Sequence, residues 1–380
     1  MARVWPLGFA FCCLLGCSSE PHVGPVWLDD AHIAVYGNGV TNEDCRSDIC
    51  QHNENVDAVT WHGAIYMVHR TAKSQILGPN CSWFVYRSTD GGKTLERVAH
   101  ILGPTDRDLR DPHFYTIGDE LYLFGGTRLP GAPVHDNDID ATETAFKTSD
   151  GVTWASLGPV APHLWTLWRP RLENGVWYSA AYHDDDSQIA LFSSTDGLGW
   201  TLGATVYQVP EDHEDETEIL FMPSGAMLAL VRLDGTDAEN LGDEGRLREK
   251  VCWGLPPYDA FTCPQELTGV RLDGPVAWFW HDRLFVAARK HLQSDTAPKK
   301  RMALYEITGD FANAGTIGIK EWGELPSAGD TAYAGVTPID DHRFFIAWYS
   351  GDLVRDENWT LGQISETDIW QGVVDLSKLQ

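Results

Sequence analysis

The feature that most constrains this chain is a repeated strand–turn–strand unit. Each copy has a short run of aromatic and β-branched residues, a turn that contains Gly, Asp or Asn, and a second such run. The copies occupy residues 56–69, 112–124, 169–178, 219–231, 276–286 and 333–348. Repeats at intervals of roughly 45–60 residues are typical of propeller blades, which bury their faces against one another. The sequence therefore predicts an all-β fold, a six-bladed β-propeller.

The N-terminus carries a predicted export signal. Arg3 precedes a short apolar run over residues 4–15, and the sequence then reads Leu14-Leu15-Gly16-Cys17. This resembles the bacterial lipobox, in which the cysteine is acylated, and the apolar run is too short to span a bilayer. The alternative is an ordinary signal peptide with an accidental cysteine. We expect a signal peptide with its lipobox, a tether and a propeller, at residues 1–17, 18–26 and 27–380.

The export signal sets the expected location and the treatment of the cysteines. Ser18 after Cys17 favours, by resemblance to enteric lipoproteins, a lipid-anchored protein of the outer membrane; an extracellular protein is the other possibility. Disulfides persist outside the cytoplasm. Cys252 and Cys263 could join one hairpin, whereas one cysteine is left over among three that the sequence cannot pair, Cys45, Cys50 and Cys81. The spacings fit no zinc pattern, so we expect no metal and no cofactor.

The charge limits the partners. The chain has 55 acidic and 28 basic residues, a formal net charge of −27. Such a surface repels nucleic acid and anionic lipid. We therefore expect no nucleic-acid partner, membrane contact only through the lipid anchor, and a monomer.

Three turns share a further motif. Residues 88–95 fit the pattern S-x-D-x-G followed by an apolar residue, and residues 148–154 and 194–200 are versions one residue shorter. Within such a turn the Asp accepts backbone N–H bonds and Gly takes a positive φ. With three copies in step with the blades, the chain resembles the sialidase-like (Asp-box, BNR repeat) propellers, in a divergent bacterial lipoprotein branch. This resemblance implies that the Asp-box carboxylates are structural; they are Asp90, Asp150 and Asp196.

Propeller geometry predicts where a site lies. The start of the first strand and the end of the second converge on one face around the axis, and arginine recurs there. Clustered arginines favour bidentate binding of a carboxylate, sulfate or phosphate, unless each is a clamp paired with a neighbouring acid. The predicted substrate-binding residues are Arg70, Arg110, Arg169, Arg232, Arg289 and Tyr349.

The sialidase resemblance implies the catalytic pair. In that family a Glu at the start of the fourth blade deprotonates a nucleophilic Tyr of the last blade, and Glu216 and Tyr333 stand at those places. Arg232 matches the second arginine of the sialidase triad and Arg289 the third. The chain departs from the family where Asn55-Val56-Asp57 replaces the first R-I-P motif, and where residues 71–82 contain no acid.

Asp111 supports a second catalytic hypothesis. Arg110-Asp111-Pro112 resembles the acidic motif of five-bladed furanosidases, so Asp111 and Glu216 could form the carboxylate pair of a glycosidase. Alternatively, Pro112 simply starts a strand. The sequence favours an exo-acting, sialidase-like glycoside hydrolase for an acidic glycan, with Asp111 as the acid. The alternative is a non-catalytic surface propeller that binds a glycan or a protein.

Overall fold

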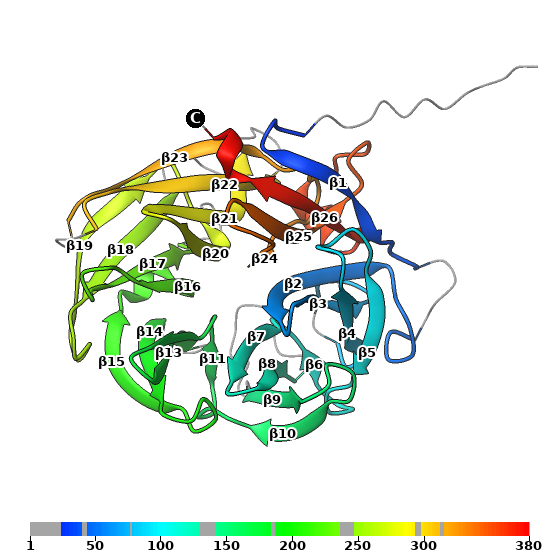
Figure 1. Cartoon of the computed structure of the whole chain (residues 1–380), viewed down its shortest axis with the longest axis horizontal. Coiled ribbons are helices and arrows are strands. Elements are labelled where there is room, and N and C mark those ends of the chain that lie inside the picture. Colours follow the sequence, from blue (N-terminus) through cyan, green and yellow to red (C-terminus); the bar gives the residue numbers. More distant parts are fainter. Residues whose placement is uncertain are drawn as a thin grey trace, which may run out of the picture.

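Six antiparallel sheets surround a central axis in the computed structural model (Figure 1), so the predicted six-bladed propeller is confirmed. The structure describes residues 24–39, 44–76, 78–129, 142–183, 187–235, 247–292, 298–311 and 315–379. The predicted signal peptide, its Cys17 and most of the predicted tether lie outside these ranges. No helix within them is long and apolar enough to cross a membrane.

The first three blades follow one another along the chain, each with its first strand nearest the axis. Their strands are β2 (His52–Trp61), β3 (Ala64–Ala72), β4 (Cys81–Ser88) and β5 (Glu96–Ile101); β6 (Asp108–Leu109), β7 (His113–Ile117), β8 (Glu120–Arg128), β9 (Thr142–Thr148) and β10 (Ala155–Pro159); and β11 (Trp165–Leu167), β12 (Arg171–Glu173), β13 (Val176–His183), β14 (Gln188–Ser194) and β15 (Thr201–Tyr207).

Blades four and five repeat this order, and blade six takes its outermost strand from the other end of the chain. Their strands are β16 (Glu214–Phe221), β17 (Met227–Leu233), β18 (Arg248–Gly254) and β19 (Phe261–Thr268); β20 (Asp273–Trp280), β21 (Arg283–Leu292), β22 (Lys299–Gly309) and β23 (Ile317–Glu324); and β24 (Gly335–Pro338), β25 (Arg343–Gly351), β26 (Thr367–Asp375) and β1 (Leu28–Val35).

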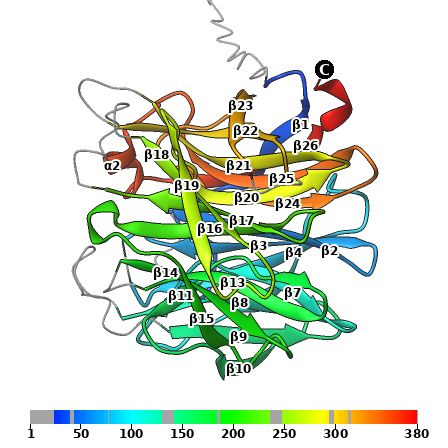
Figure 2. The same cartoon turned by 90° about the vertical axis from the view of Figure 1, so that its left-hand side faces the viewer.

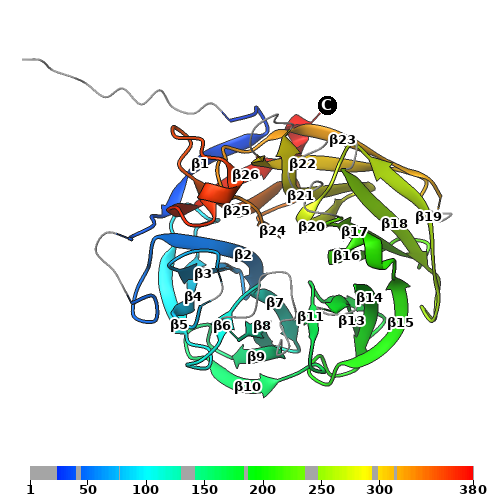
Figure 3. The same cartoon turned by 180° about the vertical axis from the view of Figure 1, so that it is seen from behind.

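The pairing of β1 with β26 closes the ring. Leu28 lies opposite Val374 and Val35 opposite Ile369, so the two ends of the described chain share one sheet. Figure 2 shows the ring edge-on, and the short helix α2 (Trp359–Gly362) lies on the face that Figure 3 turns toward the viewer. Trp359 of this helix donates from Nε1 to the carboxylate of Asp330, beside the predicted site (3.1 Å).

The apolar core is divided among the spaces between adjacent blades, where six clusters of buried side chains lie within the described residues. Strand β25 shows why the middle strands are apolar on both faces. Phe345 and Ala347 pack toward blade one, whereas the alternate residues Ile346 and Trp348 pack toward blade five. Burying each large side chain contributes roughly 1.5–3 kcal/mol, so every blade depends on both neighbours.

Two disulfides answer the question that the cysteine spacing leaves open. Cys252 and Cys263 join β18 to β19, the hairpin that the sequence suggests. Cys45 pairs with Cys50, and Cys81 is a buried thiol.

The three motif turns are held by their own aspartates. In the second, Asp150 Oδ1 accepts the backbone N–H groups of Val152 (2.8 Å) and Thr153 (2.7 Å). Asp90 and Asp196 accept backbone N–H groups of their own turns in the same way. The residue that closes each turn packs into a cluster between blades; these residues are Leu95, Trp154 and Trp200.

Candidate active site

The first strand of each blade is interrupted at one point along its length. Blades two and three each have their first strand split in two, and β2, β16 and β20 contain register shifts. In blade six, β24 begins only after an irregular stretch. The interruptions fall at residues 55–56, 110–112, 168–170, 215–216, 274–275 and 331–334. Prolines contribute to them because Pro112, Pro170 and Pro275 cannot donate to a strand ladder.

These breaks turn side chains toward the axis. Asn55, Asp111 and Tyr333 take positive φ values of 52°, 47° and 48°, which non-glycine residues rarely adopt. Bulges next to functional sites commonly re-aim a side chain, and backbone strain of this kind gathers at such sites. Most of the contacts between blades described below involve a residue in or beside one of these breaks.

Tyr333 and Glu216, predicted to be the catalytic pair, are in contact across the axis. The Tyr333 hydroxyl donates to Glu216 Oε1. The other carboxylate oxygen, Oε2, accepts from Arg232 Nη1 and from the backbone N–H of Gly274 (2.8 Å). Burial, together with the charges of Glu216 and Asp111, raises the pKa of Tyr333 well above its ordinary value. The phenol is therefore neutral in the resting site, and its proton points at a carboxylate.

Asp111 lies in the same group. Its Oδ1 accepts from Asn55 Nδ2 (2.6 Å), and its side chain is buried. Burial raises the pKa of Asp111 to about 6, with Glu216 adding to this effect and Arg110 opposing it. A carboxyl group with this pKa is still partly protonated near neutral pH, which suits a general acid.

Arg70 and Arg232, two of the predicted substrate-binding arginines, each form a bidentate pair with one carboxylate and contact a second one. Arg70 forms a bidentate pair with Asp108, through Nε (3.0 Å) and Nη2 (2.7 Å), and its Nη1 contacts Glu54. Arg232 forms a bidentate pair with Asp234, through Nε (2.6 Å) and Nη2 (2.9 Å), and its Nη1 contacts Glu216. These contacts correspond to the clamp alternative that the sequence left open.

Arg169 occupies the axis. Its backbone lies in the break of blade three, and its guanidinium contacts three other blades. Nη1 contacts Asp57 of blade one, Nη2 donates to the Ala334 carbonyl of blade six (2.8 Å), and Nε donates to the Pro275 carbonyl of blade five (3.4 Å). The side chain is 7% exposed. The predicted substrate ligand thus lies where it joins blades one, three, five and six.

The remaining predicted ligands are Arg289, Arg110 and Tyr349. Arg289 pairs with Asp273 through Nη2 (2.7 Å) and Nε (2.9 Å), but its Nη1 has no hydrogen-bond partner among the described residues. Arg110 is 15% exposed, and its Nη2 contacts the Gln75 carbonyl. The hydroxyl of buried Tyr349 donates to Asp330 (3.2 Å), and its ring stacks on that of Tyr333 at 6.2 Å.

Sequence reasoning assigned no role to most of the carboxylates that meet these arginines. Three of them share one position, directly across from an arginine and just before the break in the first strand. The pairs are Glu54 with Arg70, Asp108 with Arg128 and Asp273 with Arg289. The sequence signal for these pairs is an acidic residue just before the break in the first strand, together with an arginine at the end of the second strand. Asp215, next to Glu216, was missed as well; burial and its carboxylate neighbours raise its pKa.

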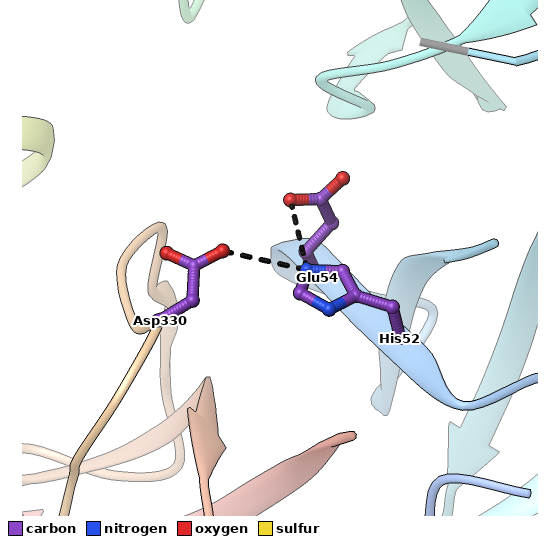
Figure 4. A group of neighbouring side chains, drawn as sticks. All are labelled: His52, Glu54 and Asp330. Atoms are coloured by element: carbon purple, nitrogen blue, oxygen red, sulfur yellow. Dashed lines mark ion pairs between the residues drawn. The ribbon is translucent and has the colours of Figure 1, made fainter. Parts of the chain in front are cut away.

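One group of potential metal ligands was also missed. His52, Glu54 and Asp330 each offer one ligand atom, and these atoms lie within 4.8 Å of one another. Figure 4 shows the three side chains pointing toward one another, two from β2 and one from the loop before β24.

Comparison with solved structures identifies the fold. A protein of unknown function from Dyadobacter fermentans matches with a TM-score of 0.61 and 15% identity, over 91% of this chain and 99% of its own. The Trypanosoma rangeli sialidase matches with a TM-score of 0.62 and 13% identity, over 90% and 59%. The NanB sialidase of Streptococcus pneumoniae gives 0.61 and 9%, over 90% and 71%. No family profile and no curated sequence matches. The fold is therefore the sialidase-like propeller, and this chain spans about three fifths of the trypanosomal enzyme.

The position of Arg169 predicts a large effect on stability. Arg169→Met should lower the free energy of unfolding by about 3–5 kcal/mol, because it leaves Asp57 buried without its ion pair. Chemical denaturation should detect this loss. Arg97→Met is the control, since Arg97 pairs with Asp48 at the exposed surface (2.6 Å) and should change stability by about 0–1 kcal/mol. Equal losses in both variants would rule out a structural role for Arg169 on the axis.

Proposed function

We propose that this protein is a sialidase-like glycoside hydrolase that acts on an acidic glycan outside the cytoplasm. The observation that carries the proposal is the hydrogen bond from Tyr333 to Glu216, made between residues that the sequence places 117 positions apart. A neutral phenol aimed at a carboxylate on the axis is the arrangement that a tyrosine nucleophile requires.

The pair supports one chemical step. The Tyr333 oxygen attacks the anomeric carbon while the phenol proton passes to Glu216 Oε1, and the bond to the leaving oxygen breaks. Because the pKa of Tyr333 is raised, the free phenolate is scarce, so the proton must leave during the attack. Arg232 Nη1 and Gly274 N–H hold the other oxygen of Glu216 and thereby fix the accepting oxygen. Water then releases the sugar from Tyr333.

Asp111 is proposed as the acid that protonates the leaving oxygen. Its pKa of about 6 keeps part of the population protonated, and Glu216, which raises that pKa, is close enough to interact with it. Asn55 orients the carboxyl group.

An acidic substrate is supported by two arginines with remaining donor capacity. Arg289 Nη1 and Arg110 Nε have no hydrogen-bond partner among the described residues, and guanidinium groups bind carboxylates well. The trypanosomal sialidase, which has the same fold, forms a covalent intermediate with difluorosialic acid.

A non-catalytic binding propeller is the second candidate, and one observation favours it. Arg232 Nη1 contacts Glu216 directly, so the carboxylate that would accept the Tyr333 proton is already engaged by a cation. The same guanidinium also lies 3.3 Å from Asp273 and 2.6 Å from Asp234, so its charge is shared among several acids.

The first test is turnover. The full chain should hydrolyse at least one member of a panel of chromogenic sialosides and uronides, and none of the matched neutral glycosides. Tyr333→Phe should lower kcat by at least about 10³-fold, because the nucleophile is lost, with the melting temperature nearly unchanged. Glu216→Gln should also be inactive.

The control for this test is Tyr115→Phe, which removes a buried hydroxyl that donates to the Gly197 carbonyl (3.0 Å) and leaves the catalytic pair intact, so turnover should be kept. Equal turnover by wild type and Tyr333→Phe would disprove the tyrosine mechanism. No hydrolysis of any member, combined with binding of an acidic glycan, would favour the second candidate.

The second test is pH dependence. A general acid must be protonated, so kcat/KM should fall about tenfold per pH unit above the pKa of Asp111, near 6. Asp111→Asn should abolish this limb and slow substrates with poor leaving groups by about 10²–10⁴-fold, with less effect on nitrophenyl leaving groups. Asp215→Asn is the control for the neighbouring carboxyl group and should keep the limb. A limb that survives in Asp111→Asn would exclude Asp111 as the acid.

Export is a further part of the proposal, supported by the two disulfides, since such bonds are rare in the cytosol. In a bacterial host that processes lipoproteins, the wild-type chain should fractionate with membranes and carry a lipid on Cys17. Cys17→Ser should shift it to the soluble envelope fraction, whereas Cys13→Ser should not. Membrane association that survives Cys17→Ser would contradict the lipid anchor.

A further inference from the structure

We propose that His52, Glu54 and Asp330 bind a divalent transition-metal cation of the zinc type, which ties blade one to blade six. This site is separate from the proposed hydrolytic chemistry. The candidate ligand atoms are His52 Nε2, Glu54 Oε2 and Asp330 Oδ2, carried by side chains that are each at most 1% exposed (Figure 4).

All three atoms lack a hydrogen-bond partner among the described residues. Buried polar atoms are almost always paired, so three orphans that face one point are unusual. A cation between them would satisfy all three at once.

The other polar atoms of the same side chains are already held. His52 Nδ1 lies 2.9 Å from the Ser365 carbonyl, so this nitrogen carries a proton and Nε2 presents its lone pair when the ring is neutral. Glu54 Oε1 contacts Arg70, and Asp330 Oδ1 accepts from Tyr349 (3.2 Å) and Trp359 (3.1 Å). Such outer contacts orient metal ligands in many proteins.

The distances fit a shared cation better than hydrogen bonds. His52 Nε2 is 3.4 Å from Asp330 Oδ2 and 3.6 Å from Glu54 Oε2. N–H···O bonds measure about 2.7–3.2 Å, so both separations are too long. Ligands about 2.0–2.1 Å from a tetrahedral zinc ion are separated from each other by about 3.4 Å.

Charge also calls for a cation here. Asp330 is fully buried, and the nearest guanidinium nitrogen in the described part of the chain, Arg289 Nη1, is 4.0 Å from its Oδ1. A buried carboxylate that has neutral hydrogen-bond donors but no close cation is costly. One imidazole with two carboxylates suits zinc and related ions, whereas calcium prefers six to eight oxygens.

The competing occupant is a proton. Burial lowers the pKa of His52, but Asp330 and Glu54 outweigh this effect and raise it to about 9 when no cation is present. An imidazolium could then compensate the two acids, so metal content, rather than charge balance, decides between the two occupants.

The location gives the cation a structural consequence. Asp330 precedes Tyr333 by three residues, and Tyr349 bonds to Asp330 while its ring stacks on Tyr333. A cation that fixes Asp330 would therefore order the loop that carries Tyr333.

The test is the metal content of the full chain, purified from cells grown with added zinc and dialysed exhaustively. Elemental mass spectrometry should find about one equivalent of a divalent transition metal per chain, because a buried ion exchanges slowly. The melting temperature should fall when the scan is run with a chelator, since the metal binds only the folded state. Neither readout requires hydrolytic activity, so failure of the hydrolase proposal leaves this test unaffected.

His52→Gln should lose the metal. The matched control is His69→Gln, which changes an equally buried histidine of the same blade with no carboxylate contact among the described residues. If His52→Gln does not fold, X-ray absorption at the metal edge of the wild type should show imidazole nitrogen and carboxylate oxygen as ligands. Wild type with no more metal than His52→Gln, metal retained in that variant, or a spectrum that shows sulfur would each overturn the proposal.

Discussion

Compensation of buried charge around the axis is the constraint on which the inner part of this ring depends. Six first strands bring carboxylates and guanidinium groups together where little water reaches them, and an unpaired member would cost several kcal/mol. Arg169 meets this constraint most directly, since one side chain contacts residues of three other blades. The apolar clusters hold neighbouring blades together, but they lie between blades and cannot join those on opposite sides of the axis.

The sequence predicted the ring because its repeat is a local pattern: each unit signals its own two strands, and the number of units sets the number of blades. The resemblance to sialidases also predicted that Tyr333 and Glu216 meet, and the two side chains are in contact. Partners within one blade, such as Glu54 for Arg70, leave a signal in the sequence, whereas pairs such as Arg169 with Asp57 do not, because they link different blades and depend on strand breaks. Pro112 and Pro170 mark two breaks in the sequence, but those at Asn55 and Glu216 have no proline. His52 was missed because its two acidic neighbours come from opposite ends of the chain.

Catalysis, anion binding and the stability of the inner ring make different demands on the same charged residues. Proton transfer from Tyr333 needs an available oxygen on Glu216, whereas a stable inner ring needs the contact between Glu216 and Arg232. The structure divides the two oxygens of Glu216 between these demands: Oε2 is held by Arg232 and Gly274, and Oε1 faces Tyr333. Anion recognition is divided in a similar way. Arg70 bonds to two acids, whereas Arg289 keeps one nitrogen without a hydrogen-bond partner in the described chain.

The closing strand has a mechanical consequence. β1 is the outermost strand of blade six and is joined to its sheet through β26 alone, by pairings that shift register twice. A force applied to the chain before residue 24 acts first on β1. It is transmitted to β26 of the same blade before it reaches any other blade. Trp27 resists it, because the ring is 2% exposed and its Nε1 donates to the Trp322 carbonyl of blade five (3.0 Å). Under tension β1 would therefore be the first strand to separate from the ring.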